Sequence, residues 1–462
     1  MERSFIKQTV EDFTISQILD LHSNVKNKEE LDLQKTLQEH NVCLSEFLSI
    51  INCRYGIDLN NNDKKKFKNL SIENFIKLIK EKIIKKASNE IDSKVIFDNF
   101  VFSGRCKRLT SPYEINIDLT FQCNLRCIFC YSSSTNQHNK SSEMSTDEIF
   151  DIIDEFKKLN GAFVLFGGGE PFIRDDFLEI FKYTKSKGLW TYVLTNGSLI
   201  TEEVAYEYAK YFNPLFDKIQ VSLDGATPEI NDKQRGVKGA FDSTLRGITN
   251  LTSTGKIRPL INTVVTKLNY NDIPNILKLA VKNNAYTYRC LKLQKVGRGS
   301  KGILFEKIAI NQDEGDKLYE YLSQKRDELM GMIGIATDNA FIFPMATKAI
   351  RDKFERRPNT KPNSFSCSAG TTKLAIAPDG GIVPCSYFYD YPEFYLASIK
   401  DRSLKDIWED ESIWGLFREP LEVKGKCKKC DYLYACKTGC RLLSYVNCSD
   451  MGGPDLGCTY NP

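Results

Sequence analysis

Histidine is scarce in this sequence, with three residues among 462, which leaves little for a histidine-rich zinc or haem site. No run of about 18 apolar residues occurs, so no membrane-spanning helix is expected. The first thirteen residues mix charges with single apolar residues and lack the apolar core of a signal peptide. The net charge of +4 is small for this length and gives no reason to expect nucleic-acid binding. These absences together predict a cytoplasmic protein in a reducing compartment.

Cysteine, in contrast, is abundant and unevenly distributed. Of fifteen cysteines, three lie between Cys123 and Cys130, and eight lie between Cys367 and Cys458. Thiols stay reduced in the cytosol, so clustered cysteines indicate metal binding or catalysis rather than disulfides. The remaining four are Cys43, Cys53, Cys106 and Cys290. All but Cys106 lie within apolar patterns and are expected to be buried core residues.

Residues 1–95 are predicted to form a helical N-terminal domain. Apolar residues recur three and four positions apart in the segments 14–21, 31–38, 44–53 and 72–86. The stretches YGIDL and LSIENFIKLI resemble the second half of an acyl- or peptidyl-carrier domain. In such carriers a serine bears the phosphopantetheine arm, but the matching position lies near Asn41, where there is no serine. The resemblance implies a module that binds the substrate or its leader segment, or a structural relic, without the arm.

Residues 108–300 show short apolar runs that alternate with helical stretches. Ser145, followed by Glu148, forms the capping-box pattern that marks a helix start. This alternation implies parallel strands joined by right-handed crossovers, and six units are too few for a closed eight-stranded barrel. We therefore expect an α/β fold built on a partial (β/α)6 TIM-type barrel. Its strands are expected at 114–120, 163–166, 191–194, 218–223, 260–265 and 286–293.

Two further regions complete the chain. Residues 301–364 are charged, with helical periodicity, and are expected to form a helical connector. Residues 365–462 hold eight cysteines together with glycine and proline, and show little periodicity. We expect this cysteine-rich C-terminal domain to bury little apolar surface and to depend on bound metal for its order.

The first cysteine group follows the first expected strand directly. The segment TFQCNLRCIFCYSS places Cys123, Cys127 and Cys130 in a CxxxCxxC arrangement on one loop. Three thiolates can hold three irons of a [4Fe–4S] cube and leave the fourth iron open to a small ligand, whereas ferredoxin clusters use four cysteines. The alternative is a zinc site, which needs a fourth ligand such as His138. Because His138 lies in a polar loop that is expected to be solvated, the cluster is the favoured interpretation.

Three further motifs lie at the ends of the second, third and fourth expected strands: FGGGEP at 166–171, TNG at 195–197 and SLDG at 222–225. With the cysteine loop, they resemble the radical S-adenosylmethionine (SAM) superfamily over about residues 113–295. The resemblance implies an enzyme in which SAM binds the open iron and yields a 5′-deoxyadenosyl radical. The SAM contacts that the resemblance implies are Phe129 at the adenine, Gly168 and Gly169 for close approach, Glu170 at the amino group, Thr195 and Asn196 beside it, Ser222 and Asp224 at the ribose, and Arg235 at the carboxylate. One of these implied contacts, that of Arg235 with the SAM carboxylate, has an alternative, in which Arg235 lies on the surface beside a glycine loop.

The C-terminal cysteines resemble the SPASM domain of radical SAM enzymes that modify peptides and proteins. A cysteine pair spans Gly380, a run of four cysteines follows, and a single cysteine comes last. The resemblance implies an outer [4Fe–4S] cluster with four thiolates and an inner one with three. The inner cluster then has an open iron or an eighth ligand. The outer ligands would be Cys427, Cys430, Cys436 and Cys458, the inner ones Cys367, Cys385 and Cys440, and the candidate eighth ligands Cys448, Cys290 and Cys106.

Two points about this domain stay open. Some members of the family carry a further cysteine about six residues after the first, and here that position is Lys373, which favours the open iron. A pair of zinc ribbons is the alternative to iron–sulfur clusters, and it suits Cys427 and Cys430 taken alone.

The resemblance predicts three [4Fe–4S] clusters, SAM, and a precursor peptide as substrate, with flavodoxin or ferredoxin as electron donor and no nucleic-acid or membrane partner. Thioether crosslinking, as in sactipeptide and ranthipeptide maturation, is the most specific version of the predicted peptide modification. The alternatives are formylglycine formation as in anaerobic sulfatase maturases, radical oxidation or epimerisation of a small or carrier-bound substrate, and a non-enzymatic iron–sulfur electron carrier. No catalytic acid or base is identified. Tyr286, Tyr288 and Lys292 share one face of the sixth expected strand, but the sequence does not show which face points inward.

Overall fold

The computed structural model describes residues 106–137, 140–336, 367–419, 421–458 and 460–462, together with 34–35, 67, 70–79, 81 and 100–103. Most of the expected N-terminal helical domain therefore lies outside the described residues, including the carrier-like position near Asn41 and the cysteines Cys43 and Cys53. His138 also lies outside them. Residues 72–79 form a helix, inside the segment 72–86 for which one was predicted.

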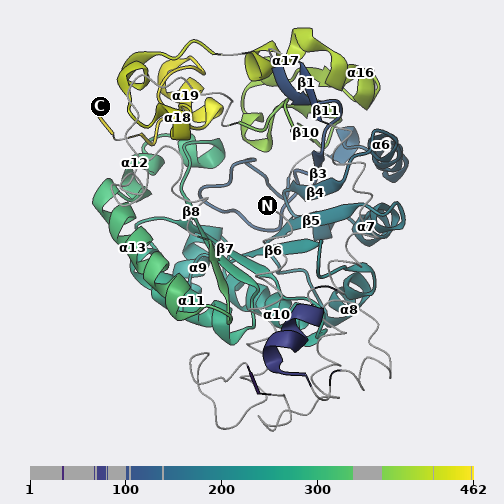
Figure 1. Ribbon diagram of the computed structural model, residues 1–462, viewed down its shortest axis with the longest axis vertical. Coiled ribbons are helices and arrows are strands. Elements are labelled where there is room, and N and C mark those ends of the chain that lie inside the picture. Colours follow the sequence, from purple (N-terminus) through teal and green to yellow (C-terminus); the bar gives the residue numbers. More distant parts are fainter. Residues whose placement is uncertain are drawn as a thin grey trace.

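Ten strands of the described residues form one sheet, in the order β12-β11-β10-β3-β4-β5-β6-β7-β8-β9. Its centre consists of six parallel strands, which confirms the predicted partial α/β barrel. These are β3 (Glu114–Thr120), β4 (Phe163–Gly168), β5 (Trp190–Thr195), β6 (Lys218–Ser222), β7 (Leu260–Val265) and β8 (Thr287–Lys292). The connecting helices are α6 (Thr146–Lys158), α7 (Phe177–Ser186), α8 (Glu202–Tyr211), α9 (Pro228–Arg235), α10 (Ala240–Ser253) and α11 (Ile273–Lys282). Figure 1 shows α6, α7 and α8 side by side along the outside of the sheet.

Helix α6 shows how local sequence starts and seats these helices. The hydroxyl of Ser145 accepts a hydrogen bond from the Glu148 amide at 3.2 Å, and the Glu148 carboxylate accepts one from the Ser145 amide at 2.7 Å. The predicted capping box is therefore present, and it satisfies two amides that the helix leaves unpaired. The buried residues Ile149, Ile152, Ile153 and Phe156 follow at helical spacing and pack against the sheet.

Strand alternation decides which side chains enter the barrel. On β3, the side chains of Ile115, Ile117 and Leu119 belong to the apolar core, whereas Asn116 and Asp118 lie on the opposite face. On β8, Tyr288 and Cys290 belong to the same core. The expectation that Cys290 is a buried core residue is confirmed. Arg289, between them, therefore faces the barrel interior.

The predicted boundary at residue 365 does not divide the sheet. Strand β10 (Lys373–Ile376) pairs in parallel with β3, and Lys373 lies opposite Glu114. Strands β11 (Gly381–Val383) and β12 (Ala397–Ser398) extend this edge. At the other edge, β9 (Gly334–Ala336) pairs with β8 and follows the helices α12 (Leu304–Ile308) and α13 (Gln312–Glu328). The segment expected to be a helical connector thus also adds a strand to the barrel.

The expectation that residues 365–462 bury little apolar surface is wrong. Trp408 and Trp414, on α16 (Leu404–Glu409) and α17 (Glu411–Arg418), are fully buried, as is Phe417. The Arg418 guanidinium lies over both indole rings and donates to the Gly370 carbonyl at 2.6 Å. The segments that make up this core are each too short to show a periodic pattern in the sequence. The region ends in α18 (Leu433–Cys436) and α19 (Arg441–Cys448), which Figure 1 shows beside α12.

A short hairpin, β1 (Phe100–Ser103) with β2 (Cys106–Leu109), completes the described strands. The Trp408 indole donates to the Leu109 carbonyl at 3.1 Å, which ties this hairpin to the C-terminal core. No helix of the described residues is both long and apolar enough to span a bilayer.

Candidate active site

The loop after β3 brings Cys123, Cys127 and Cys130 together at the carboxyl ends of the barrel strands. Its base is closed by the Cys123 amide donating to the Thr135 carbonyl at 3.2 Å and the Thr135 amide donating to the Phe121 carbonyl at 3.1 Å. Burial, together with the charges of Glu170, Cys127 and Cys130, raises the pKa of Cys123 to about 12. Three thiols that repel one another as thiolates need a cation to hold them ionised.

Two other segments fix this loop in place. The amides of Arg126 and Ile128 donate to the carbonyls of Arg235 and Gln234, at 2.9 and 3.0 Å, at the end of α9. From the opposite side, the Arg298 guanidinium donates to the Cys127 carbonyl at 2.9 Å and to the Ser134 carbonyl at 2.7 Å. The sequence reasoning missed Arg298. Its position between two glycines after the last barrel strand was the available signal.

The glycines of FGGGEP lie against the cysteine loop. The Gly169 amide donates to the Thr120 carbonyl at 2.7 Å, and the Glu170 amide donates to the Gln122 carbonyl at 2.9 Å. A Cβ at Gly168 would lie 2.3 Å from the Thr120 oxygen, and one at Gly169 would lie 2.0 Å from the Gln122 oxygen. These glycines therefore let β4 approach the start of the loop, and their closeness to a ligand stays a prediction.

Glu170 joins three of the predicted motif segments. It is fully buried, and its carboxylate accepts hydrogen bonds from the Thr195 hydroxyl at 2.7 Å and from the Asn196 amide at 2.7 Å. Burial raises the pKa of Glu170 to about 7, against the lowering effect of these hydrogen bonds. The Asn196 side chain in turn donates to the Asn124 side chain at 2.9 Å, inside the cysteine loop. The TNG motif thus holds Glu170 beside Cys123.

Asp224 and Arg235 form a buried ion pair at 2.6 Å, and Arg235 also donates to the Cys127 sulfur at 3.4 Å. Arg235 is buried, so its alternative placement on the surface is excluded. The Asp224 carboxylate also accepts the Val264 amide at 2.8 Å, and its contact with the ribose stays a prediction. The Nε of Arg235 is buried without a partner among the described residues, which suits an anionic ligand next to Cys127.

Ser222 and Phe129 are the remaining predicted contacts of this site. Ser222 is half-buried at the end of β6. Phe129 packs with Leu293 and Ile308 beside the loop. Their contacts with ribose and adenine stay predictions.

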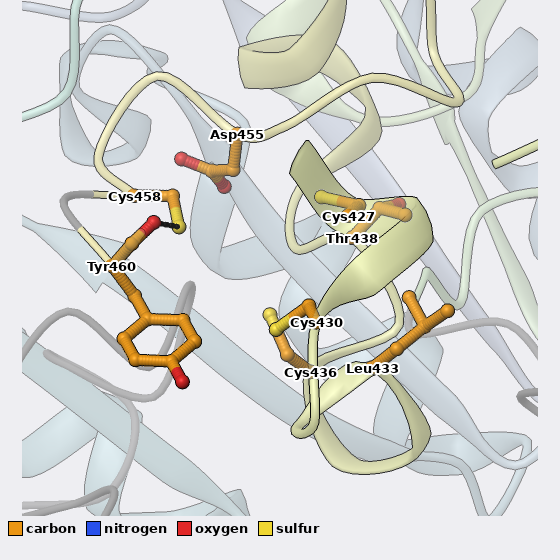
Figure 2. A pocket seen from close by; sticks show the side chains of 8 residues that line it. All are labelled: Cys427, Cys430, Leu433, Cys436, Thr438, Asp455, Cys458 and Tyr460. Atoms are coloured by element: carbon orange, nitrogen blue, oxygen red, sulfur yellow. Dashed lines mark hydrogen bonds between the residues drawn. The ribbon is translucent and has the colours of Figure 1, made fainter. Parts of the chain in front are cut away.

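The C-terminal cysteines separate into a set of four and a set of three. Cys427, Cys430, Cys436 and Cys458 line one pocket, together with Leu433, Thr438, Asp455 and Tyr460. Figure 2 shows Cys458 facing the other three thiols across this pocket. In the described part of the chain, no three His, Cys, Asp or Glu side chains converge on one metal ion. Four thiolates can hold all four irons of a [4Fe–4S] cluster, and the assignment of this set to the outer cluster stays a prediction.

Cys367, Cys385 and Cys440 form the second set, and we call it the inner group. Burial, together with the charge of Cys367, raises the pKa of Cys385 to about 12. Burial is the main cause of the raised pKa of Cys440, and the charges of Cys385 and Cys367 also raise it. Of the candidate eighth ligands, Cys448 is exposed on α19, Cys290 lies in the core behind β8, and the side chain of Cys106 is not described.

The sequence matches the Radical SAM superfamily over residues 117–280 and the SPASM iron–sulfur cluster-binding domain over residues 367–431. It is 31% identical over 351 residues to the mycofactocin maturase MftC of Mycolicibacterium smegmatis, covering 76% of this chain and 83% of that protein. The chain belongs to the radical SAM superfamily. It is an enzyme that uses SAM and iron–sulfur clusters.

Other relatives of this radical SAM enzyme differ in what they make. The AdoMet-dependent heme synthase of Methanosarcina barkeri is 29% identical over 355 residues, which cover 76% of this chain and 97% of that protein. Among solved structures, Streptococcus suis SuiB bound to its precursor peptide SuiA has a TM-score of 0.63 at 20% identity, covering 82% of this chain and 81% of that one. The structure of anSMEcpe with bound AdoMet has a TM-score of 0.54 at 18% identity, covering 72% and 90%. These structures share the fold.

A polar cluster inside the barrel of this radical SAM enzyme was not foreseen from the sequence. Arg289 donates to the Asn262 side-chain oxygen at 3.0 Å, to the Tyr192 hydroxyl at 3.3 Å and to the Gln220 side-chain oxygen. All three of these acceptors are neutral groups. The positive charge is therefore available to a ligand in the barrel.

The wall between the cysteine loop and the inner group is aromatic. The rings of Tyr131 and Tyr387 meet edge to face at 5.7 Å, and each tyrosine lies one or two residues from a cysteine of a different group. Beside them, the hydroxyl of Tyr389 donates to the Asp118 carboxylate. Burial raises the pKa of Asp118 to about 6, although the hydrogen bonds from Tyr389 and Ser386 lower it.

Proposed function

We propose that this radical SAM enzyme modifies a ribosomally synthesised peptide and forms a thioether crosslink in it. The observation that carries this proposal is the division of ten cysteines into groups of three, three and four. A group of three thiolates leaves one corner of a cube for another ligand. The 31% identity to a mycofactocin maturase and the fold shared with SuiB, solved with its precursor peptide, support a peptide substrate.

The first group, Cys123, Cys127 and Cys130, would hold the SAM-binding cluster. The inner group would hold a second cluster, and Cys427, Cys430, Cys436 and Cys458 a third. When bound, the clusters and SAM supply a 5′-deoxyadenosyl radical and an acceptor for the electron that remains, with flavodoxin or ferredoxin as donor.

The residues of the chain position these groups. Glu170 would accept from the SAM amino group, since its carboxylate has room for one donor beyond the Thr195 hydroxyl and the amides of Asn196 and Phe172. Arg235, with its free Nε next to Cys127, would hold the SAM carboxylate. The inner group would hold the thiolate of a substrate cysteine at its fourth corner.

The test is anaerobic incubation of reconstituted, reduced enzyme with SAM and the precursor peptide encoded beside its gene. We expect a product lighter by two hydrogens in which one cysteine no longer reacts with iodoacetamide, because its sulfur is in a thioether. The Cys127→Ala variant is the control and should leave the peptide unchanged. A peptide of unchanged mass, while SAM is cleaved to 5′-deoxyadenosine, would contradict the proposal.

A second candidate is SAM-dependent conversion of a porphyrin. The heme synthase of M. barkeri is matched over 97% of its length, and the Fe-coproporphyrin III synthase of the same organism is 28% identical. The Arg289 cluster supports this candidate, since a propionate would pair with its free charge. Incubation with Fe-coproporphyrin III in place of the peptide tests it, and a shift in the porphyrin's mass would favour it over thioether formation.

A further inference from the structure

Lys373 lies beside the segments that carry two cysteines of the inner group. Its amide donates to the carbonyl of Ser368, next to Cys367, at 3.1 Å, and the register of β10 with β11, in which Ala375 lies opposite Val383, continues to Lys373 opposite Cys385. It is the first residue of β10 and lies opposite Glu114 of β3, six residues after Cys367. Its ammonium is 3.3 Å from the Glu114 carboxylate, and the two side chains are 28% and 24% exposed. Burial alone would lower the pKa of Lys373, but the charges of Glu114, Cys385 and Cys367 raise it. The pairing of β10 therefore brings Lys373 next to Cys385 and to the segment of Cys367, and the negative charges around it favour its ammonium form.

Other charges face the inner group from neighbouring elements. Arg441, at the start of α19, acts on Cys367 as a second cation. Asp118 of β3 acts on Cys385, and Asp455 acts on Cys440, whose amide donates to the Asp455 carboxylate at 2.8 Å. Among these groups, Lys373 is the one whose charge acts on two inner cysteines and also forms an ion pair across the sheet.

We propose that Lys373 raises the reduction potential of the inner cluster and that Glu114 limits this effect by pairing with the ammonium. The inference rests on the proposed function, in which the inner group holds a cluster. Reduction adds one negative charge to a cluster, and a nearby cation stabilises that charge. The Lys373 side chain and the inner cysteines are partly buried, so water screens the charge of the ammonium only in part. Lys373 thus makes the inner cluster a better acceptor for the electron left after hydrogen abstraction.

The alternative role for this pair is structural, as an ion pair that holds β10 against β3. The two roles predict different results when each partner is removed. If the pair is structural, Lys373→Met and Glu114→Gln lose the same contact. Both variants should then shift the potential of the inner cluster in the same direction. An electrostatic pair gives opposite shifts in potential, because one variant removes a positive charge and the other removes a negative charge.

The experiment is a redox titration of the full chain, reconstituted anaerobically and followed by electron paramagnetic resonance. The signal of the inner cluster is identified as the one absent from Cys440→Ala. In Lys373→Met we expect the ratio of reduced to oxidised inner cluster at a fixed potential to fall about tenfold, which is about 59 mV for one electron. Glu114→Gln should raise that ratio, Lys373→Arg should stay near wild type, and the double variant Lys373→Met/Glu114→Gln should lie between the two single variants. Iron content per chain should equal that of wild type in each variant of Lys373 and Glu114, and should be lower in Cys440→Ala.

Three results would overturn the inference. The first is an unchanged inner potential in Lys373→Met at full iron content. The second is a shift of the same sign in Lys373→Met and Glu114→Gln, which indicates a structural pair. The third is a Cys440→Ala variant that keeps every signal and all its iron. Only this third result also rejects the inner cluster of the proposed function, so the two failures are distinguishable.

Discussion

The Cα of Gly297 lies so close to the Cys130 carbonyl that a Cβ there would be 2.2 Å from the oxygen. Gly297 has a φ of +55°, and Gly302, five residues later, has a similar φ of +58° but no atom within 4 Å of a Cβ. The two glycines therefore share the same backbone requirement, and only Gly297 has a close contact with the cysteine loop.

Gly297→Ala should displace the cysteine loop, because the new methyl group overlaps with the loop's backbone. We expect loss of the iron bound by that loop and of 5′-deoxyadenosine formation. Gly302→Ala is the matched control: it should cost about 1 kcal/mol of stability for the left-handed backbone and leave SAM cleavage intact. Iron content, SAM cleavage and thermal melting of both variants provide the comparison. Equal loss of activity in both would show that backbone strain, rather than the contact, matters.

Arg298 should matter for SAM cleavage although it touches no predicted SAM contact. Its guanidinium holds the Cys127 and Ser134 carbonyls, and supporting residues of this kind typically contribute about 10- to 100-fold to metal-site affinity or activity. We expect Arg298→Ala to lower 5′-deoxyadenosine formation by about that factor. Lys307→Ala, at an exposed cation on α12, is the control. Wild-type rates in both variants would reject this role for Arg298.

Replacing a single cysteine should remove the iron of only the cluster that this cysteine binds. Cys127→Ala should lower iron by about four atoms per chain and abolish SAM cleavage, because the loop can no longer hold its cluster. Cys436→Ala, in the pocket of Figure 2, should also lower iron by about four but leave some SAM cleavage. Cys290→Ala, in the barrel core, should keep all iron. Iron analysis of the three proteins tests the assignment, and iron loss from Cys290→Ala would contradict it.

The parts of this fold that the sequence predicted are those with strong local signals. The six central strands carry apolar runs, and Ser145 with Glu148 marks a helix start through its own hydrogen bonds. Strands β9 to β12 have two to four residues each, too few to show an alternating pattern, and their place in the sheet depends on pairing with β8 and β3 far away in the chain.

The direction of side chains on β8 illustrates a second limit. Both faces of this strand carry polar or aromatic residues, so its pattern does not show which face is buried. The structure places Tyr288 in the core and Arg289 in the barrel. Similarly, the motif FGGGEP was recognisable, but the contact of its glycines with the cysteine loop depends on how two strand ends meet.

Asp118 should make stability depend on pH. Its pKa is raised from 3.8 to about 6 by burial, so the folded protein favours the protonated form. The associated stability is fully present below about pH 4 and is lost as the pH rises through about 6. Asn does not ionise, so Asp118→Asn does not lose this stability as the pH rises. The free energy of unfolding of the variant minus that of wild type should therefore increase by about 1 kcal/mol between pH 5 and pH 8. Asp401→Asn, at an exposed carboxylate, should show no such trend in anaerobic urea unfolding.

Arg289 should affect the substrate and leave SAM chemistry unchanged. Its guanidinium enters the barrel with only neutral partners, Asn262, Gln220 and Tyr192, and a hydrogen bond to a charged group contributes about 1.5–3 kcal/mol. If the substrate presents a carboxylate there, Arg289→Gln should lower kcat/KM about 10- to 100-fold, chiefly through a higher KM. Substrate-free SAM cleavage should stay at the wild-type rate, and Arg289→Lys should recover part of the loss. A fall in substrate-free SAM cleavage would show instead that Arg289 supports the barrel itself.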